Sequence, residues 1–364
     1  MRGLAASEVL KGLILAGGHG TRLRPLTYTG NKHMLPIANK PMLLYGLEHL
    51  RNAGIGEVGV ILGPIREGVT ETLGDGSRFG LKITYISQPE PRGLAHAVLL
   101  SEEYMKGEPF VMYLGDNLLR QGVQDFVRVF EQRKADCVVG VCPVTDLSRY
   151  GIVELENGRV KRLIEKPMSS TSNLALVGVY VFGNSIFDAV KAIKPSGRNE
   201  LEITDAIQVL VSEGKKVEIE HVKGWWKDTG KPEDLLEANQ LVLADIQRDI
   251  QGELSHETSV TGNLSMGTGS KTVGTVNIRG PAIIGRNCLI GPDAFIGPYT
   301  SIGDGCTLKN VEIENSIVMK ECQIESGRRI VDSLIGSGSI IADGERRVPR
   351  GYKLILGEKS FVQV

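Results

Sequence analysis

Residues 284–308 read IGRNCLIGPDAFIGPYTSIGDGCTL, and this stretch decides the fold of the C-terminal third of the chain. An aliphatic residue recurs here every six positions, and glycine directly follows four of these positions. The aliphatic residues are Ile278, Ile284, Ile290, Ile296, Ile302 and Leu308, and the glycines are Gly285, Gly291, Gly297 and Gly303. Such a period is typical of a parallel β-helix, in which the aliphatic side chains point inward and the glycines turn the corners. An antiparallel sandwich with glycine-rich turns is the alternative, although it would not keep so strict a period.

Beyond residue 308 the repeat continues less regularly. It returns at Ile324 and Ile330, slips by one residue before Ile335 and resumes at Ile341. We interpret the slip as a bulge or a short insertion.

A predicted helix precedes the repeat and marks a domain boundary. Pro232 opens a stretch rich in Leu and Ala, which we expect to be helical to about Ile250. With 364 residues and 41% hydrophobic composition, the chain is long enough for two domains. We predict a first domain at residues 11–245 and a second at residues 246–364. Residues 1–10 form an N-terminal extension, which we expect to be dispensable or to reflect a misassigned start.

The composition excludes several classes of protein. Lys and Arg number 42 and Asp and Glu number 43, so a net charge of −1 provides no global positive field for nucleic acid. The 45 glycines follow no Gly-X-Y period, which excludes collagen. Five cysteines without a C-x-x-C pair argue against a disulfide framework or a zinc knuckle, and no run of about 18 apolar residues indicates a membrane span. We expect a protein of the reducing cytoplasm with no nucleic-acid or membrane partner.

Short apolar runs alternate with helical patterns from Lys11 to about Leu114, which predicts βαβ units and a mainly parallel sheet. The predicted strands here are 12–15, 58–62, 82–86 and 110–114, and the predicted helices are 42–53 and 94–105. After Asp116 the order is mixed, so we expect an antiparallel extension. Its predicted strands are 138–141, 152–155, 159–164 and 176–181, and its predicted helices are 186–193 and 203–212.

A glycine-rich loop follows the first predicted strand, where residues 15–27 read LAGGHGTRLRPLT. Closely spaced glycines let backbone N–H groups approach phosphate oxygens, and an arginine can then neutralise the charge with two hydrogen bonds. Leu23 stands where a dinucleotide-binding loop needs its third glycine, and no Gly-Lys-Ser/Thr closes a Walker A loop. A triphosphate is therefore the expected ligand, although a plain structural turn would also account for the glycines alone.

Further motifs follow the loop along the chain. They are NKHMLPIANKPM at 31–42, QPEPRGLA at 88–95, GDN at 115–117, YG at 150–151, EKP at 165–167, EITD at 202–205 and WKDTG at 226–230. With the loop, they resemble the signature of the sugar-1-phosphate nucleotidylyltransferases, over residues 11 to about 235. The motif at 88–95 is similar to that of the glucose-1-phosphate thymidylyltransferases, and the six-residue repeat is similar to that of their longer form.

This resemblance implies a fold and a reaction. The implied fold is α/β: a Rossmann-like nucleotidyltransferase domain with a mixed, mainly parallel sheet, followed by a left-handed parallel β-helix domain. The implied reaction transfers a nucleotidyl group from dTTP to glucose 1-phosphate and gives dTDP-glucose and pyrophosphate, with Mg²⁺ as cofactor. Because the attacking sugar phosphate is already an anion, this chemistry needs alignment and cations and no enzyme nucleophile.

The resemblance also assigns roles to residues on the motifs. Arg22 is expected to clamp the triphosphate, and Lys32 to stabilise the α-phosphate, where the two anions meet. Lys166 is the expected cation for the sugar phosphate. Nucleotide contacts are expected from Gly17, Gly18, Gly20, Thr21, Gln88 and Gly93, and sugar-phosphate contacts from Gly151, Glu165, Lys166, Gly178 and Glu200.

Asp116 and Asp228 are the predicted ligands of Mg²⁺. Asp116 follows an apolar strand at its carboxyl end, where ligands bind in open α/β sheets, and carboxylates are good ligands for hard cations. Each aspartate would also fit an ordinary turn. His33 is expected to be only a flank of its motif, and Pro167 is expected to hold Lys166 in an extended conformation.

Three alternatives stay open. The first is a UTP-dependent or broad-specificity enzyme, because an amide such as that of Gln88 does not distinguish the 5-methyl group of thymine. The second is a bifunctional enzyme that also acetylates an amino sugar, although none of the six histidines lies in the repeat to serve as a base. The third is a non-catalytic sensor, which would not need to keep Arg22, Lys32, Asp116 and Asp228 intact. We favour a structural tail that packs against the catalytic domain and supports a homo-oligomer.

Overall fold

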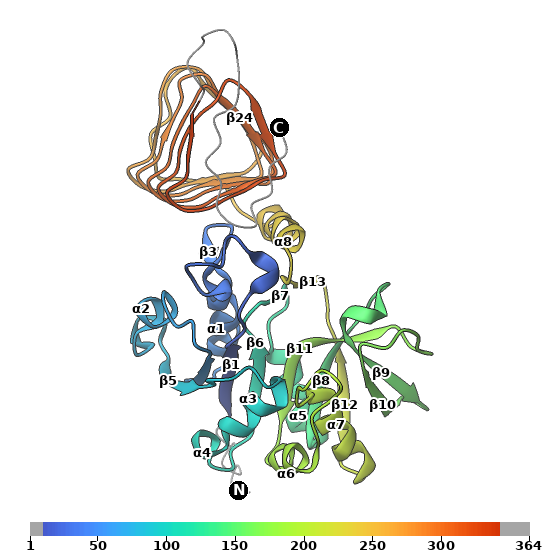
Figure 1. The fold of residues 1–364 in the computed structure, drawn as a ribbon. Coiled ribbons are helices and arrows are strands. Elements are labelled where there is room, and N and C mark those ends of the chain that lie inside the picture. The colour runs from blue at the N-terminus through green and yellow to red at the C-terminus, as the bar shows by residue number, and fades with distance from the viewer. Residues whose placement is uncertain (1–9, 343–364) are drawn as a thin grey trace, which may run out of the picture. The chain divides into compact units, whose positions relative to one another are not determined.

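The computed structural model describes residues 10–342, which divide into two compact units (Figure 1). The first unit comprises the chain up to Gly20 together with residues 30–34 and 42–228. The second comprises residues 21–29, residues 35–41 and the chain from Thr229 on. Two short N-terminal segments thus cluster with the C-terminal part. The predicted domain limits stay predictions, and all of the predicted extension except Leu10 lies outside the described residues.

A mixed nine-stranded sheet forms the centre of the first unit, as the sequence predicts. Its parallel part consists of β6 (Phe110–Leu114), β1 (Lys11–Ala16), β4 (Glu57–Leu62) and β5 (Lys82–Ser87), in that order. The other strands are β8 (Cys137–Pro143), β9 (Gly151–Glu156), β10 (Arg159–Glu165), β11 (Leu174–Phe182) and β12 (Val217–His221). Strand β11 runs antiparallel to β6, β8 and β9, which confirms the predicted antiparallel extension.

Seven α-helices belong to the described residues of the first unit. They are α1 (Met42–Asn52), α2 (Val69–Leu73), α3 (Leu94–Leu100), α4 (Glu102–Met105), α5 (Gln124–Arg133), α6 (Ser185–Ala192) and α7 (Ile203–Ser212). The single helix predicted at 94–105 is wrong, because the chain breaks into α3 and α4 at Ser101. The Ser101 hydroxyl donates to the Val98 carbonyl at 2.7 Å, a local bond that competes with continued helix.

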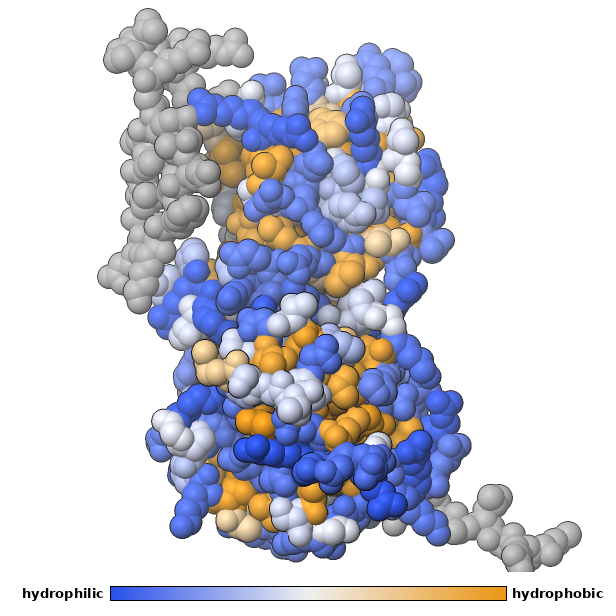
Figure 2. Space-filling view, turned by 90° about the vertical axis from the view of Figure 1, so that its right-hand side faces the viewer, coloured by the Kyte–Doolittle hydropathy of each residue, from blue (hydrophilic) through white to orange (hydrophobic). Residues whose placement is uncertain are grey.

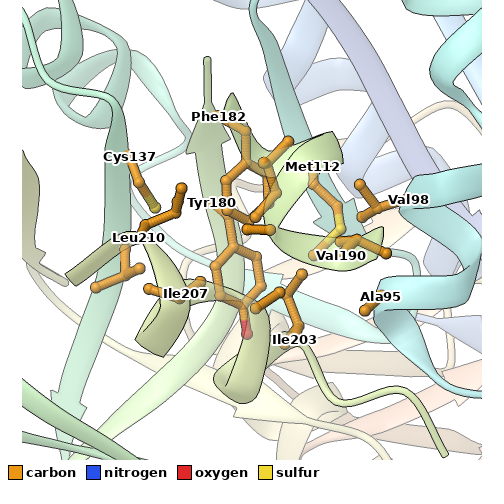
Figure 3. Close-up of a cluster of buried hydrophobic side chains, with 14 of the residues drawn as sticks. Ala95, Val98, Met112, Cys137, Tyr180, Phe182, Val190, Ile203, Ile207 and Leu210 are labelled. Atoms are coloured by element: carbon orange, nitrogen blue, oxygen red, sulfur yellow. The ribbon is translucent and has the colours of Figure 1, made fainter. Parts of the chain in front are cut away.

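Hydrophobic cores lie on both faces of this sheet. Leu13 and Met112 belong to one core, whereas their neighbours Ile14 and Val111 belong to the other, as expected when side chains alternate along a strand. Figure 3 shows the first core, in which sheet residues meet α3, α6 and α7. The labelled residues are Ala95, Val98, Met112, Cys137, Tyr180, Phe182, Val190, Ile203, Ile207 and Leu210. This packing fixes α7 on the sheet and with it the position of Thr204 in its first turn.

The second unit contains α8 (Pro232–Ala244) and three sheets of short parallel strands (Figure 1). The first sheet consists of β14 (Asp249–Ile250), β16 (Leu264–Met266), β19 (Ala282–Ile284), β22 (Thr300–Ile302), β25 (Ile317–Val318) and β28 (Leu334–Ile335). The second consists of β15 (Thr258–Thr261), β18 (Val276–Arg279), β21 (Ala294–Ile296), β24 (Val311–Glu314) and β27 (Arg329–Val331). The third consists of β17 (Lys271–Thr272), β20 (Leu289–Ile290), β23 (Thr307–Lys309), β26 (Gln323–Glu325) and β29 (Ile340–Ala342).

These three sheets fit the predicted parallel β-helix, and we call residues 249–342 the repeat region. The predicted aliphatic residues Ile278, Ile290 and Ile302 are all fully buried in its core. The helix predicted to run to about Ile250 ends at Ala244 instead, because Ile250 pairs with Met266 as part of β14.

The irregularity in the repeat comes from shortened coils, which corrects the predicted bulge or insertion. Ile290 pairs with Leu308, eighteen residues later, which equals three repeats of six. Ile302 pairs with Val318, only sixteen residues later. The shortening begins between Leu308 and Ile313, because Ile296 pairs with Ile313, seventeen residues later.

Of the four predicted corner glycines only Gly291 has a positive φ, of 100°, and most corners turn at other residues. Asn287, Asp293 and Tyr299 adopt the left-handed conformation there, with φ of 55°, 55° and 60°. Gly303 has no positive φ, but a Cβ on it would lie 2.6 Å from the backbone nitrogen of Lys320. The glycine thus permits close contact with the next coil, whereas Asn, Asp and similar residues turn the corner.

The face shown in Figure 2 is mostly polar, with apolar residues in separate groups. Within residues 10–342, no helix is both long and apolar enough to cross a membrane.

Candidate active site

The glycine-rich loop lies against two polar side chains of the first unit. A Cβ on Gly18 would lie 3.1 Å from Cε of Lys32, and a Cβ on Gly17 would lie 3.0 Å from Oε1 of Gln88. The backbone of the loop therefore adjoins an ammonium group and an amide. Three of the predicted nucleotide-binding residues, Gly17, Gly18 and Gln88, thus come together with the predicted catalytic Lys32.

Lys32 forms an ion pair with Asp116, and the two side chains are only 14% and 15% exposed. Asn117 Nδ2 donates to the other carboxylate oxygen of Asp116 at 3.0 Å. Burial alone would raise the pKa of Asp116, but Lys32, His33 and the hydrogen bonds outweigh it and hold this pKa well below its usual range. The Asp116 carboxylate is therefore ionised throughout the physiological pH range.

Asn31 and His33 hold the backbone on both sides of Lys32. The Asn31 amide donates to the carbonyls of Ala16 at 3.0 Å and Ile65 at 2.9 Å, and its oxygen accepts the backbone N–H of His33 at 2.9 Å. His33 is only 2% exposed, and burial together with Lys32 lowers its pKa to about 3, so the ring is neutral. His33 thus supports the backbone beside Lys32, and that it is otherwise only a flank of its motif stays a prediction. No sequence pattern signals these contacts, because their partners lie in other strands and loops.

Asp228 lies beside Asp116 through the pairing of two short strands. Strands β7 (Asn117–Leu119) and β13 (Trp226–Asp228) are antiparallel, and Asn117 faces Asp228 directly. Trp226 Nε1 donates to Asn117 Oδ1 at 2.6 Å, which adds a side-chain bond to the pairing. Because Asp116 directly precedes Asn117, both predicted metal ligands lie at the same end of this ribbon.

These carboxylates fit a hard cation such as Mg²⁺, which prefers oxygen ligands. The Arg149 guanidinium lies 3.9 Å from Asp228, as Lys32 lies beside Asp116, so each carboxylate currently has a cationic neighbour. Among residues 10–342 there is no group of three or more His, Cys, Asp or Glu placed to hold a metal ion. Two carboxylates alone suit Mg²⁺ where a polyphosphate supplies further oxygens.

A second group of charged residues surrounds Glu165. Glu165 pairs with Gly151 across β10 and β9, and a Cβ on Gly151 would lie 3.3 Å from Oε2 of Glu165. Arg198 Nη2 donates to Glu165 Oε1 at 3.0 Å, and Thr204 Oγ1 donates to Oε2 at 3.3 Å. Lys166 Nζ lies 3.8 Å from Glu165. The structure thus brings together the predicted Gly151, Glu165 and Lys166.

Lys166 is not extended, which corrects the effect expected of Pro167. Its φ is 44°, in the left-handed region, and its N–H donates to the Tyr150 carbonyl at 3.0 Å. This bond continues the β9–β10 pairing past Glu165. The chain therefore turns at Lys166, in spite of the restriction that the following Pro167 imposes.

Arg198 and Glu202 also belong to this charged group, although neither is among the site residues that the sequence predicts. Arg198 donates to Glu202 through Nη2 at 2.8 Å and Nε at 3.2 Å, and Glu202 is 5% exposed. The predicted Glu200 is more exposed, and its carboxylate lies 3.6 Å from Arg198. Burial first, and then the charge of Glu202, raise the pKa of Glu165 against the opposing effects of Lys166 and Arg198. The sequence does point to Glu202, because Glu202 is the first residue of the EITD motif at 202–205.

The predicted Gly93 and Gly178 both make close contacts that exclude a side chain. Gly93 has φ 101°, and a Cβ on it would overlap the carbonyl of Leu201. Gln88 Nε2 donates to the Gly93 carbonyl at 3.3 Å and lies 3.2 Å from Nδ1 of His96. Gly178 has φ 70°, and its Cβ would lie 3.0 Å from Cγ of Asn117.

Thr21 and Arg22 form the short 3-10 helix Thr21–Leu23 and belong to the second unit, whereas Gly20 belongs to the first. Arg22 lies against the segment that leads into α8, since a Cβ on Gly230 would lie 3.3 Å from Nη2 of Arg22. Any side chain at Gly230 would therefore press on the guanidinium.

The chain matches two known families along its length. Residues 11–245 match the Nucleotidyl transferase family, and residues 273–363 match the GMPPB C-terminal domain. It is 46% identical to the low-salt glycan biosynthesis nucleotidyltransferase Agl11 of Haloferax volcanii over 98% of this chain and 100% of that protein. It is 45% identical to a glucose-1-phosphate thymidylyltransferase of Streptomyces antibioticus over 98% of this chain and 99% of that protein.

A solved structure is also similar to the chain. It is a putative glucose-1-phosphate thymidylyltransferase from Bacillus anthracis in complex with a sucrose, 34% identical, with a TM-score of 0.62 over 66% of this chain and 97% of that one. This similarity supports the α/β fold described above. The chain therefore belongs to the nucleotidyl transferase family, among the sugar-1-phosphate nucleotidyltransferases.

Proposed function

We propose that the protein transfers a thymidylyl group from dTTP to glucose 1-phosphate and releases pyrophosphate. The observation that carries this proposal is the cluster of Lys32, Asp116 and Asp228 beside the glycine-rich loop. It combines a cation and two carboxylates with a glycine-rich loop whose Gly18 and His19 are exposed, and phosphate chemistry uses such groups. The relative from Streptomyces antibioticus and the structure from Bacillus anthracis carry the name of this activity.

The proposed reaction is an in-line displacement at phosphorus. An oxygen of the sugar phosphate forms a bond to the α-phosphorus, and the bond from that phosphorus to the bridging α–β oxygen breaks, so pyrophosphate leaves with the electron pair. The attacking oxygen already carries negative charge, and no general base is needed. The barrier lies in aligning two anions and neutralising their charge.

Each proposed catalytic residue supplies charge or position. Lys32 reaches the α-phosphate with its ammonium group, and Arg22 binds the triphosphate through its planar guanidinium. Lys166 neutralises the sugar phosphate while Glu165 accepts hydrogen bonds from sugar hydroxyls. Asp116 and Asp228 would hold Mg²⁺, which when bound neutralises charge on the triphosphate.

Gln88 is the proposed reader of the pyrimidine base. Its amide nitrogen is engaged with Gly93, while its oxygen lies on the side of Gly17. An amide oxygen accepts the N3–H of thymine and of uracil equally. Preference for dTTP over UTP is therefore supported by the named relatives rather than by this contact.

A pyrophosphate-release assay tests the proposal. It crosses dTTP, UTP, ATP, CTP and GTP with the 1-phosphates of glucose, mannose, galactose and N-acetylglucosamine, with Mg²⁺ present. We expect the highest kcat/KM with dTTP and glucose 1-phosphate. A higher value with UTP would replace the thymidylyl assignment by a uridylyl one, and no turnover with any pair would exclude the enzyme.

We further propose that the repeat region is a left-handed β-helix and that the protein forms a homo-oligomer of the reducing cytoplasm. The five free cysteines support that compartment. Sedimentation equilibrium tests the oligomer. For the alternative acetyl transfer, the expectation that no histidine lies in the repeat does not hold for the repeat region, because His256 lies between β14 and β15, with its side chain 91% exposed. Consumption of acetyl-CoA with an amino-sugar phosphate would establish that second activity.

A further inference from the structure

A tight hairpin forms the second half of the motif at 31–42 and belongs to the second unit. Its strands are β2 (Pro36–Ile37) and β3 (Lys40–Pro41), and Ile37 pairs with Lys40. The two turn residues, Ala38 and Asn39, have φ of 45° and 62°. Two positive φ values in a two-residue loop are the mark of a type I′ turn, which needs support when one of its residues is alanine.

Asn239, in the middle of α8, supplies that support. Its side-chain oxygen accepts the backbone N–H of Ala38 at 2.9 Å and the hydroxyl of Ser301 at 2.7 Å. Its amide nitrogen donates to the carbonyl of Tyr299 at 3.0 Å. Asn239 is 1% exposed, so these bonds form away from water. One buried amide thus joins the hairpin to a corner of the repeat region.

Neighbouring contacts join the same parts. Asn39 Nδ2 donates to the Ile302 carbonyl at 2.7 Å, next to the Ser301 contact. On the sheet that contains β22 and β25, Ser301 and Ile317 point away from the repeat core, yet they are 0% and 1% exposed. This sheet is therefore covered on its outer side as well.

The loop that carries Arg22 also contacts this assembly. A Cβ on Gly336 of the repeat region would lie 3.7 Å from Cδ2 of Leu26, and a Cβ on Gly230 would lie 3.3 Å from Arg22. Gly230 stands two residues before α8, and Asn239 lies two turns further along that helix. Helix α8 thus extends from the Arg22 guanidinium to the buried amide that holds the hairpin.

We propose that Asn239 is a positioning residue for triphosphate binding. By fixing the hairpin and α8 on the repeat region, it holds the Arg22 loop in the conformation that meets the nucleotide. This role rests on the proposed function of Arg22 as the triphosphate cation. It gives the repeat region a part in substrate binding, beyond the structural and assembly role expected from the sequence.

The test is the effect of Asn239→Ala on the KM of each substrate. Losing the side chain leaves the Ala38 N–H, the Ser301 hydroxyl and the Tyr299 carbonyl without this partner. We expect the KM for the triphosphate to rise about fivefold to 30-fold, the change that one or two buried hydrogen bonds produce, with the KM for the sugar phosphate almost unchanged. A purely structural role would reduce the folded fraction, and hence apparent kcat, without changing either KM.

Gln240→Ala is the matched control. Gln240 follows Asn239 in α8 and donates to Asn315 of the repeat region at 2.7 Å. We expect this variant to keep the KM values of the wild type. Equal increases of both KM values in Asn239→Ala would overturn the proposal. A rise of the triphosphate KM alone in Gln240→Ala would overturn it as well.

Ser301→Ala keeps the proposal testable if Asn239→Ala does not fold. It removes one of the three bonds and leaves the contact from Asn239 to Ala38 in place. We expect a smaller rise in the triphosphate KM, again with the sugar-phosphate KM almost unchanged. An unchanged triphosphate KM in a folded Ser301→Ala protein would count against the role of Asn239. Failure of the wild type to turn over any substrate pair would instead overturn the proposed function, so the two failures are distinguishable.

Discussion

Lys32 and Asp116 form a largely buried ion pair at the carboxyl end of β6, next to Asn117, which faces Asp228 in the paired strand. In a buried pair each charge compensates for the water that the other has lost. The same two residues are the proposed phosphate cation and metal ligand. Lys32 and Asp116 therefore contribute to both stability and activity, and suitable variants can separate the two contributions.

Lys32→Met should lower both stability and activity. The substitution leaves the Asp116 carboxylate buried without its main cation, which should lower the free energy of unfolding by about 3 kcal/mol. The double variant Lys32→Met/Asp116→Asn removes both charges and should recover most of that stability. It should stay inactive, because the cation and the metal ligand are both missing. Urea unfolding and pyrophosphate release measure the two effects, and recovery of activity in the double variant would contradict the assigned roles.

Asp228→Asn should lose turnover with little loss of stability. Asp228 is partly exposed, and its cationic neighbour Arg149 lies at 3.9 Å, so the pair contributes little to folding. We expect kcat to fall about 100-fold or more, the size seen when a group that stabilises developing charge is removed. Glu57→Gln is the control, because Glu57 pairs with the exposed Lys82 instead. Full activity of Asp228→Asn across Mg²⁺ concentrations would remove this residue from the metal site.

Glu165 should give sugar-phosphate binding a pH dependence. Burial and Glu202 raise its pKa, so folding favours the protonated form. The stability that this carboxyl contributes is present at low pH and falls as the pH rises from its unfolded pKa of about 4.3 toward the raised folded value. Because the ionised form accepts hydrogen bonds from sugar hydroxyls, the KM for glucose 1-phosphate should increase as the pH falls through the raised pKa.

Two variants isolate this effect from the titration of the substrate phosphate, whose second pKa is about 6. Glu165→Gln should lose the part of the profile that belongs to the enzyme and bind the sugar phosphate weakly at every pH. Thr204→Val removes the hydroxyl that donates to Glu165 at 3.3 Å, so its profile should move to higher pH. Identical profiles in the wild type and Glu165→Gln would show that Glu165 does not titrate in binding.

The sequence predicted those parts of the site that depend on local pattern. A strand followed by glycines predicted the loop at Gly17 and Gly18, and an apolar strand ending in aspartate predicted Asp116. Local pattern also predicted most strands of the sheet, because their apolar runs are bounded by turn residues. The family motifs added Glu165 and Lys166, which the structure places beside each other.

Contacts between distant segments were beyond local pattern. Asn239 is 201 residues from Ala38, and nothing around either residue indicates that they meet. Arg198 likewise reaches Glu165 across 33 residues. The glycines after the aliphatic positions were assigned to corners because glycine favours positive φ, but most of them serve coil-to-coil contact. Period alone does not distinguish these two uses of glycine.

Gly151→Ala should weaken sugar-phosphate binding in a way that a second substitution relieves. A Cβ at this position would lie 2.6 Å from Cγ2 of Thr204 and 3.3 Å from Oε2 of Glu165. We expect the KM for glucose 1-phosphate to rise about tenfold, or about 1.4 kcal/mol. Thr204→Ser removes Cγ2 and keeps the hydroxyl, so the double variant should regain about threefold or more. Steady-state kinetics of the four proteins checks this coupling, and additive effects would show that the Thr204 methyl group is not the obstacle.

Gly303 and Gly305 separate the two uses of glycine in the repeat region. A Cβ on Gly303 would lie 2.6 Å from the backbone nitrogen of Lys320, so Gly303→Ala should force adjacent coils apart and lower the free energy of unfolding by about 2 kcal/mol.

Gly305 has φ 73°, and its Cβ would make an ordinary contact of 3.5 Å with Glu321. Asn287 occupies the equivalent corner one coil earlier with φ 55°. Because asparagine tolerates this conformation and loses less backbone entropy than glycine, Gly305→Asn should change the free energy of unfolding by less than about 0.5 kcal/mol. Urea unfolding followed by circular dichroism measures both variants, and the opposite order of stability would contradict the coil-to-coil contact assigned to Gly303.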